Sequence, residues 1–162
     1  MGKSVYDFKV RAADGTERSL ADYRGKALLV VNSASKCGLT PQYASLETLY
    51  ERYKPRGLEV VAFPANDFGQ QEPGTNDEIQ SFCAVNYQTT FPVLAKISVK
   101  GVDIAPLYAY LTTDSGFPGD IEWNFAKFLV APDGRVAARF RADVDPLAPE
   151  VTREIEANLP AR

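Results

Sequence analysis

The chain contains no histidine, and this absence removes several kinds of chemistry at once. Serine and cysteine nucleophiles activated by histidine are excluded, as is every zinc site that uses an imidazole ligand. Only two cysteines occur, Cys37 and Cys83, so a four-sulfur metal site within one chain is excluded too. We therefore expect no metal and no bound cofactor, and any reaction must use thiols, carboxylates, amines or amides.

Long apolar runs and blocks of like charge are also missing. No segment approaches the ~20 apolar residues of a membrane span. The net charge of −3 provides no basic surface for nucleic acid or an anionic membrane. The first residues, Met1-Gly2-Lys3, begin no apolar stretch of the kind found in signal peptides. We expect a single domain over residues 1–162, located in the cytoplasm, with neither a nucleic-acid partner nor a membrane span.

Two continuous apolar runs of strand length, residues 27–31 and 58–63, are typical of central strands that are covered on both faces. Between them, tyrosines and a leucine repeat at helical spacing over residues 43–53, and Gly57 ends the pattern. A strand–helix–strand unit of this kind makes its two strands parallel.

The rest of the chain continues this alternation of strands and helices. The pattern predicts a helix that starts at Asn76 as N-cap, a weaker strand over 91–97, a helix around 104–111, an antiparallel hairpin of strands 125–130 and 135–140, and a last helix over 149–158. The predicted fold class is α/β, with a mixed central sheet and helices on both faces. Its order of elements is that of a thioredoxin-like domain, an analogy that by itself says little about function.

Cys37 follows the carboxyl end of the first buried strand and precedes the first helix. Ligands bind at this edge of open α/β sheets, and the N–H groups of a helix N-terminus favour an anion. With Lys36 as a neighbouring cation, we expect the thiolate form of Cys37 to be favoured. A free cysteine is only a few per cent thiolate at pH 7, so about 2 kcal/mol of stabilisation would ionise about half of it. The alternative is a structural cysteine in a loop.

Two further segments carry polar groups suited to the same site. Gln71 lies in a loop after the second buried strand, and its amide donates N–H without titrating. Trp123 and Asn124 stand where a later strand begins, and both side chains offer N–H donors. Taken separately, Gln71 could be a solvated surface residue and Trp123 a core residue beside a turn.

Together, these three segments resemble the glutathione peroxidase family. The resemblance covers nearly the whole chain and is carried by three pieces: Asn32-x-Ala34-Ser35-Lys36-Cys37-Gly38, then Asn66-x-Phe68-Gly69-x-Gln71-Glu72-Pro73-Gly74, then Trp123-Asn124-Phe125-x-Lys127-Phe128. It implies a thioredoxin-like fold, reduction of hydroperoxides to water or alcohols, and a catalytic tetrad of Cys37, Gln71, Trp123 and Asn124. The supporting residues around the tetrad would be Lys36, Gly38, Asn66, Phe68 and Gly69.

The resemblance also bears on Cys83. The family often has cysteine where this chain has Ala65 and glutamine where it has Asp67, so Cys83 remains as the only possible partner for Cys37. Its position resembles that of the resolving cysteine in family members that use thioredoxin. The short region over 99–122 lacks the insertion of the tetrameric, glutathione-using members, so the chain resembles the monomeric, thioredoxin-dependent branch. The alternative for Cys83 is a small buried apolar residue.

These implications amount to a mechanistic hypothesis. The Cys37 thiolate attacks a hydroperoxide and becomes a sulfenic acid, and the thiol of Cys83 then forms a disulfide with it. Gln71, Trp123 and Asn124 would donate to the sulfur and orient the peroxide. A disulfide needs Cα atoms within ~7 Å, and in the reduced protein we expect the two cysteines to lie farther apart, so that the helix around Cys83 must unwind before the disulfide forms.

Three alternatives remain open. The reductant could be glutathione, which requires a basic cluster beside Cys37, where Lys36 is the only nearby cation in sequence and Lys127 or arginines could approach in space. The chain could instead be a sensor that passes oxidation to a partner protein. A non-enzymatic structural domain would leave the three polar segments without a role.

Overall fold

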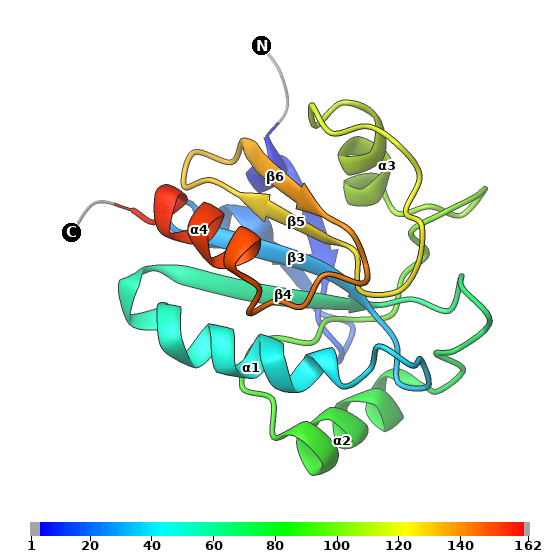
Figure 1. Cartoon of the computed structure of the whole chain (residues 1–162). Helices are drawn as coiled ribbons and strands as arrows, with labels where there is room; N and C mark the ends of the chain where they lie inside the picture. Colours follow the sequence, from blue (N-terminus) through cyan, green and yellow to red (C-terminus); the bar gives the residue numbers. More distant parts are fainter. Residues whose placement is uncertain (1–3, 161–162) are drawn as a thin grey trace.

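A four-stranded sheet in the order β4-β3-β5-β6 forms the centre of the structure, a computed structural model that describes residues 4–160 (Figure 1). Its strands are β3 (Ala27–Ser33), β4 (Leu58–Pro64), β5 (Lys127–Val130) and β6 (Val136–Phe140). Part of the expectation about the N-terminus rests on Met1-Gly2-Lys3, which lie outside the described residues. Over residues 4–160, no helix is both long enough and apolar enough to cross a membrane.

The two central strands are parallel, as the apolar runs predict. β3 pairs with β4 from Ala27↔Leu58 to Ser33↔Pro64, and every residue of both strands is buried. The connection between them is α1 (Gln42–Tyr53) followed by a short 3₁₀ turn (Lys54–Arg56). This strand–helix–strand unit is the prediction confirmed most closely, because a fully apolar strand can lie only between two covered faces.

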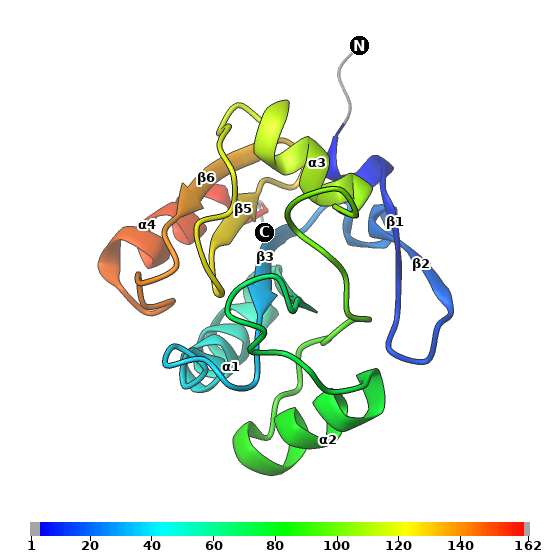
Figure 2. The ribbon, with the colours of Figure 1, turned by 90° about the vertical axis from the view of Figure 1, so that its right-hand side faces the viewer.

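Helices cover both faces of the sheet, which confirms the predicted fold class. α1 and α4 (Pro149–Asn158) pack on one face, and α3 (Pro106–Thr113) packs on the other with the segment that follows the N-terminus (Figures 1 and 2). Alternate residues of β3 point to opposite faces, so that Leu29 belongs to one apolar core and Leu28 to the other.

The predicted hairpin is present, since β5 and β6 pair antiparallel around the turn at Pro132-Asp133-Gly134. The strand predicted over 91–97 is wrong. This segment makes only two isolated bridges, Ala62↔Val93 and Ala65↔Ile97, beside β4. The proline at position 92 has no N–H to donate, so a regular ladder cannot form there.

α2 (Asn76–Tyr87) begins where the sequence predicts a helix, but its cap is different. The N-cap is Thr75, whose hydroxyl accepts from the N–H of Glu78 while the Glu78 carboxylate accepts from the N–H of Thr75. The predicted cap, Asn76, instead accepts a hydrogen bond from the N–H of Lys96 at 2.8 Å. Figure 2 shows α2 at the periphery, away from the sheet.

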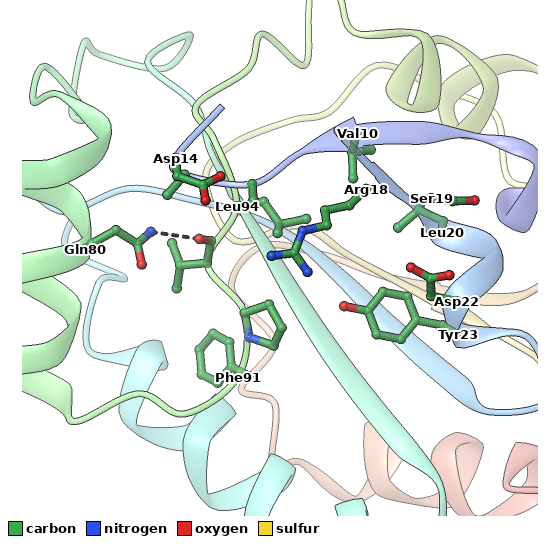
Figure 3. Close-up of a pocket in the computed structure, with 14 residues that line it drawn as sticks. Val10, Asp14, Arg18, Ser19, Leu20, Asp22, Tyr23, Gln80, Phe91 and Leu94 are labelled. Carbon is green, nitrogen blue, oxygen red and sulfur yellow. Dashed lines mark hydrogen bonds between the residues drawn. The ribbon is translucent and has the colours of Figure 1, made fainter. Parts of the chain in front are cut away.

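A short hairpin of β1 (Lys9–Arg11) and β2 (Glu17–Ser19) was not predicted, because its strands have only three residues each and are largely exposed. A hollow of about 430 Å³ lies between this hairpin and the segment over 91–94 (Figure 3). At its edge, Gln80 of α2 donates to the carbonyl oxygen of Val93 at 2.7 Å. None of the predicted site residues lines this hollow.

The strand directions bring three loops to one edge of the sheet. The carboxyl ends of β3 and β4 meet there because these strands are parallel. The amino end of β5 reaches the same edge because β5 runs antiparallel to β3, with Val31 opposite Lys127. The loop with Cys37, the loop with Gln71 and the segment with Trp123 therefore meet at this edge.

Gly134 offers a test of the hairpin turn. Its φ is +93°, and a Cβ atom there would collide with the Oγ of Ser4 and lie 3.0 Å from Cδ2 of Tyr6. Gly15 also has a positive φ, +88°, but a Cβ there would meet nothing within 4 Å. We expect Gly134→Ala to lower the free energy of unfolding by roughly 2–5 kcal/mol, because strain and overpacking add. Gly15→Ala should cost only the strain, roughly 1–2 kcal/mol. Urea denaturation measures both, and equal losses would contradict this account.

Candidate active site

Cys37 lies in a turn between β3 and α1, and its side chain is 8% exposed. α1 begins only at Gln42, so the cysteine does not directly precede the helix as the sequence suggests. The turn supplies the donor instead, since the N–H of Leu39 points to the Cys37 sulfur at 3.3 Å. Thr40 completes the turn, because its hydroxyl accepts from the N–H of Cys37 and donates to the carbonyl oxygen of Ala34. The sulfur thus accepts from the N–H two residues further along the chain, as the side-chain oxygen of an Asx or ST turn does.

Trp123 provides the second donor to this sulfur. Its indole Nε1–H points to the Cys37 sulfur at 3.3 Å. Its ring packs against Phe68, with centroids 5.6 Å apart, and is 36% exposed. Gly69 lies beside the ring with a φ of +61°, a backbone conformation that favours glycine. Two of the residues predicted to support the tetrad, Phe68 and Gly69, thus lie next to the indole.

The backbone around Trp123 is held by two buried polar residues. The side-chain amide of Asn32 donates to the carbonyl oxygen of Trp123 at 3.0 Å. The backbone carbonyl oxygen of Asn32 accepts from the N–H of Phe125. The ammonium of Lys127 donates to the carbonyl oxygen of Phe125 at 2.7 Å. Phe125 has a φ of +73°, a conformation that a bulky residue adopts only when its surroundings impose it.

Asn32 and Lys127 were not among the predicted site residues. Both are completely buried polar residues within the sequence pieces that carry the family resemblance, which is the signal that could have found them. Burial lowers the pKa of Lys127 to about 8, and two further carbonyl oxygens, those of Arg141 and Ala142, also accept from its ammonium. Such a residue contributes by fixing the backbone next to the indole.

Gln71 and Asn124 lie at the same edge, but neither donates to the sulfur as expected. The amide of Asn124 donates to the side-chain oxygen of Gln71 at 3.0 Å. Asn124 is fully buried and Gln71 is half-buried. The side-chain oxygen of Gln71 already accepts this hydrogen bond. Its Nε2–H₂ group has no partner among the described residues and can therefore donate to a ligand. The structure thus brings all four tetrad residues together, with Trp123 alone in contact with the sulfur.

Two of the remaining predicted residues, Lys36 and Asn66, form hydrogen bonds with the backbone of the loop that carries Gln71. Lys36 donates its N–H to the carbonyl oxygen of Gln71 at 3.0 Å, and Asn66 accepts from the N–H of Glu72 at 2.8 Å. The ammonium of Lys36 is exposed. Hydrogen bonds with Thr75 lower the pKa of Glu78, assisted by the charge of Lys36, whereas burial raises the pKa of Glu72 and Lys36 only opposes that shift. That Lys36 favours the thiolate of Cys37 as a neighbouring cation stays a prediction. Gly38 is exposed, with open space around its Cα.

Cys83 lies in α2 and is 1% exposed. It and Cys37 are both free thiols, and both belong to the apolar core beneath α1. Burial, assisted by the charge of Glu72, raises the pKa of Cys83 to about 11, while the adjacent hydroxyl of Tyr43 opposes this shift. The two cysteines therefore differ in environment, since the sulfur of Cys37 accepts two N–H donors and Cys83 is held as a thiol.

No group of three or more acidic, cysteine or histidine side chains that could hold a metal ion occurs between residues 4 and 160. A family model described as Glutathione peroxidase matches residues 5–112. The chain belongs to the glutathione peroxidase family. This match ends before Trp123 and Asn124, so it carries no information about these two residues.

Relatives with known names span nearly the whole chain. The chain is 46% identical to the glutathione peroxidase homolog BsaA of Halalkalibacterium halodurans over 89% of its length and 93% of the relative. It is 50% identical to the probable glutathione peroxidase 2 of Arabidopsis thaliana, over 90% and 88% of the two chains. It is 44% identical to the hydroperoxy fatty acid reductase gpx1 of Synechocystis, over 96% of each chain. The chain is therefore a peroxidase.

Solved structures agree with this assignment. The chain superposes on T. cruzi GPX1 with a TM-score of 0.75 at 34% identity, covering 99% of both chains. It also superposes on a thiol:disulfide interchange protein of the thioredoxin family from Chlorobium tepidum, with a TM-score of 0.69 at 15% identity and coverage of 98% and 97%. The second likeness concerns the fold alone and confirms that it is thioredoxin-like.

Replacing the indole tests its contact with the sulfur. We expect Trp123→Phe to slow oxidation of Cys37 by hydrogen peroxide about ten- to a hundredfold, because a hydrogen bond to a charged group contributes about 1.5–3 kcal/mol. Quenched-flow trapping of the sulfenic acid measures this rate. Phe68→Leu is the matched control, since it alters the ring packing and keeps the N–H donor, and should have a much smaller effect. A Trp123→Phe rate equal to wild type would refute the role of the indole.

Proposed function

We propose that the chain is a two-cysteine thiol peroxidase, in which Cys37 reduces hydroperoxides. The oxidised Cys37 then forms a disulfide with Cys83, and thioredoxin reduces this disulfide to regenerate both thiols. The observation that carries the proposal is the convergence of two N–H donors, from Trp123 and Leu39, on one sulfur at 3.3 Å. Two such donors stabilise an anion more than a neutral thiol. They mark this sulfur as a nucleophile.

The first step transfers one oxygen atom to the sulfur. The thiolate of Cys37 attacks a peroxide oxygen along the O–O bond and the bond breaks. The departing alkoxide or hydroxide takes up the proton that the Cys37 thiol gave up on ionising, carried to it through water. The product is a sulfenic acid and one molecule of alcohol or water. The free N–H₂ group of Gln71, fixed by Asn124 at 3.0 Å, is suited to orient the peroxide beside the sulfur.

The second step joins the two sulfurs. The sulfur of Cys83 attacks that of the Cys37 sulfenic acid, a disulfide forms and water leaves. Because Cys83 is buried in a helix, this step needs α2 to open locally. The position of α2 supports this, since only Ile79 and Cys83 of its residues are buried, and Figure 2 places it at the rim of the molecule.

The substrates are hydrogen peroxide and organic or lipid hydroperoxides. The partial exposure of Trp123 beside the sulfur supports access for bulky peroxides. Among the relatives, the Synechocystis protein is named a hydroperoxy fatty acid reductase, and one from Mesembryanthemum crystallinum is named a probable phospholipid hydroperoxide glutathione peroxidase. Thioredoxin is the proposed reductant because Cys83 offers a disulfide for it to reduce. The charge of the exposed Lys36 ammonium already acts on the carboxyl groups of Glu72 and Glu78, which disfavours a glutathione site there.

Cys83→Ser separates the two steps. We expect this variant to consume about one equivalent of peroxide and then stop, with thioredoxin-coupled turnover below roughly a few per cent of wild type, because the sulfenic acid has no internal partner. Coupled oxidation of NADPH through thioredoxin reductase measures turnover, and a parallel assay with glutathione compares the two reductants.

Ala84→Ser is the matched control for this test. It places the same hydroxymethyl group at the adjacent, exposed position of α2 and should leave turnover unchanged. Wild-type turnover of Cys83→Ser with thioredoxin would exclude a resolving role for Cys83. Slow turnover of the wild-type protein with thioredoxin, despite rapid oxidation by peroxide, would favour the sensor.

A further inference from the structure

A carboxyl group lies between the segments that carry the two cysteines. Glu72 follows Gln71 in the loop after β4, and its side chain is completely buried. Neither of its oxygens has a hydrogen-bond partner within the described residues. A buried carboxyl group without such a bond is costly to ionise, and here only Ser35 and the charges of Lys96 and Lys36 oppose the effect of burial. Packing alone therefore does not explain why a carboxyl group lies at this position.

The backbone of Glu72 is held at both ends. Its N–H donates to Asn66 at 2.8 Å, and its carbonyl oxygen accepts from the ammonium of Lys96 at 2.9 Å. Lys96 is in turn joined through its own N–H to Asn76 at the start of α2. The carboxyl group is thus fixed relative to both the catalytic loop and the helix that carries Cys83.

The carboxyl group borders a cavity of about 270 Å³ that separates these two segments. The walls of this cavity are Ser35 and Lys36 of the Cys37 loop, residues 72–74, and Glu78, Ile79 and Phe82 of α2. Cys83 follows Phe82 directly, and Ser35 and Lys36 precede Cys37, so the cavity lies between the two segments that must approach one another for the disulfide to form. Glu72 lies at this cavity, between those segments.

Electrostatic effects place the carboxyl group near the reacting thiol. The charge of Glu72 contributes to raising the pKa values of both Cys83 and Tyr43, and the Tyr43 hydroxyl lies next to the Cys83 thiol. Burial raises the pKa of Glu72 itself, while Ser35, Lys96 and Lys36 oppose this shift. The polar and charged groups around this carboxyl group come from three parts of the chain: Ser35 and Lys36 of the Cys37 loop, Lys96, and Tyr43 and Cys83 of the helices α1 and α2.

This environment leaves the resolving step without an obvious base. With a pKa of about 11, on the order of one in ten thousand Cys83 thiols is ionised at pH 7. The chain contains no histidine, and Glu78, the other acid at the cavity, is exposed and engaged in the cap of α2. Glu72 is the buried acid at this cavity.

We propose that Glu72 transfers the proton of the resolving step, an inference that rests on the proposed two-cysteine mechanism. The carboxylate of Glu72 takes the proton of the Cys83 thiol as this sulfur attacks the Cys37 sulfenic acid. The S–O bond breaks, and the same proton passes from Glu72 to the departing hydroxide, which leaves as water. The sum is one thiol and one sulfenic acid converted to one disulfide and one water, with Glu72 regenerated.

Single-turnover kinetics tests this role, and the fluorescence of Trp123 is a suitable signal because it is the only tryptophan and contacts the Cys37 sulfur. Reduced protein is mixed with one equivalent of hydrogen peroxide, and acid quenching with mass spectrometry assigns the phases to sulfenic acid and disulfide. In Glu72→Gln, we expect the first phase to stay within about twofold of wild type and the second to slow at least about tenfold at neutral pH. Asp77→Asn, which removes an exposed carboxylate from the start of α2, is the control and should leave both phases unchanged.

The pH profile distinguishes proton transfer from a merely structural role. In wild type, the second phase should rise as Glu72 ionises and then level off at a pH below the range in which the Cys83 thiol itself ionises. In Glu72→Gln it should keep rising about tenfold per pH unit toward the ionisation of the thiol, and Glu72→Asp should restore part of the plateau.

Several results would overturn the inference. These are a second phase in Glu72→Gln with the rate and pH profile of wild type, equal slowing of both phases, and a wild-type second phase that climbs without a plateau. The last result decides the question even if the variants fold poorly. Absence of any Cys83-dependent second phase in wild type would instead refute the proposed two-cysteine function.

Discussion

The two N–H donors to the sulfur of Cys37 are the interaction on which the site depends. One comes from the turn that leads into α1 and the other from the indole of Trp123, both at 3.3 Å. Neither donor titrates near neutral pH, so both are available to stabilise an anion on this sulfur in a chain that has no histidine. The other site residues serve this contact indirectly. Phe68 and Gly69 lie next to the indole, while Asn32 and Lys127 hold the backbone beside it.

The topology explains why these donors can meet. β3 and β4 end at the same edge because they are parallel, and β5 starts there because it is antiparallel to β3. The sulfur of Cys37, the amide of Gln71 and the indole of Trp123 thus come from three loops that a fully buried pair of strands holds together. Cys83 comes from α2, which lies outside this frame and contributes few buried residues. The buried frame of strands suits the first chemical step, and the peripheral helix suits a step that requires movement.

Much of this arrangement could be predicted from the sequence, because it follows from apolar patterning. The central strands, α1, the hairpin and the last helix are marked by buried runs, helical spacing or turn residues, and the strand order then places the three polar segments together. The finer contacts could not be predicted, since they depend on side-chain conformations and on local backbone strain. Asn124 donates to Gln71 and not to the sulfur, and Phe125 holds a positive φ, which no propensity indicates. The segment over 91–97 has the apolar content of a strand, yet Pro92 prevents a regular ladder. Asn76 and Thr75 are both suitable helix caps by residue type, and only the hydrogen bond between Asn76 and Lys96 shows that Asn76 has another partner.

The ionisation state of Cys37 tests the central claim most directly. Ultraviolet titration of the thiolate in the Cys83→Ser variant isolates this one sulfur, because the chain has no third cysteine. The account predicts a strong thiolate absorbance already at neutral pH, which falls when Trp123 is replaced by Phe. A thiolate signal that develops only in the alkaline range of a free cysteine, unchanged by Trp123→Phe, would contradict it.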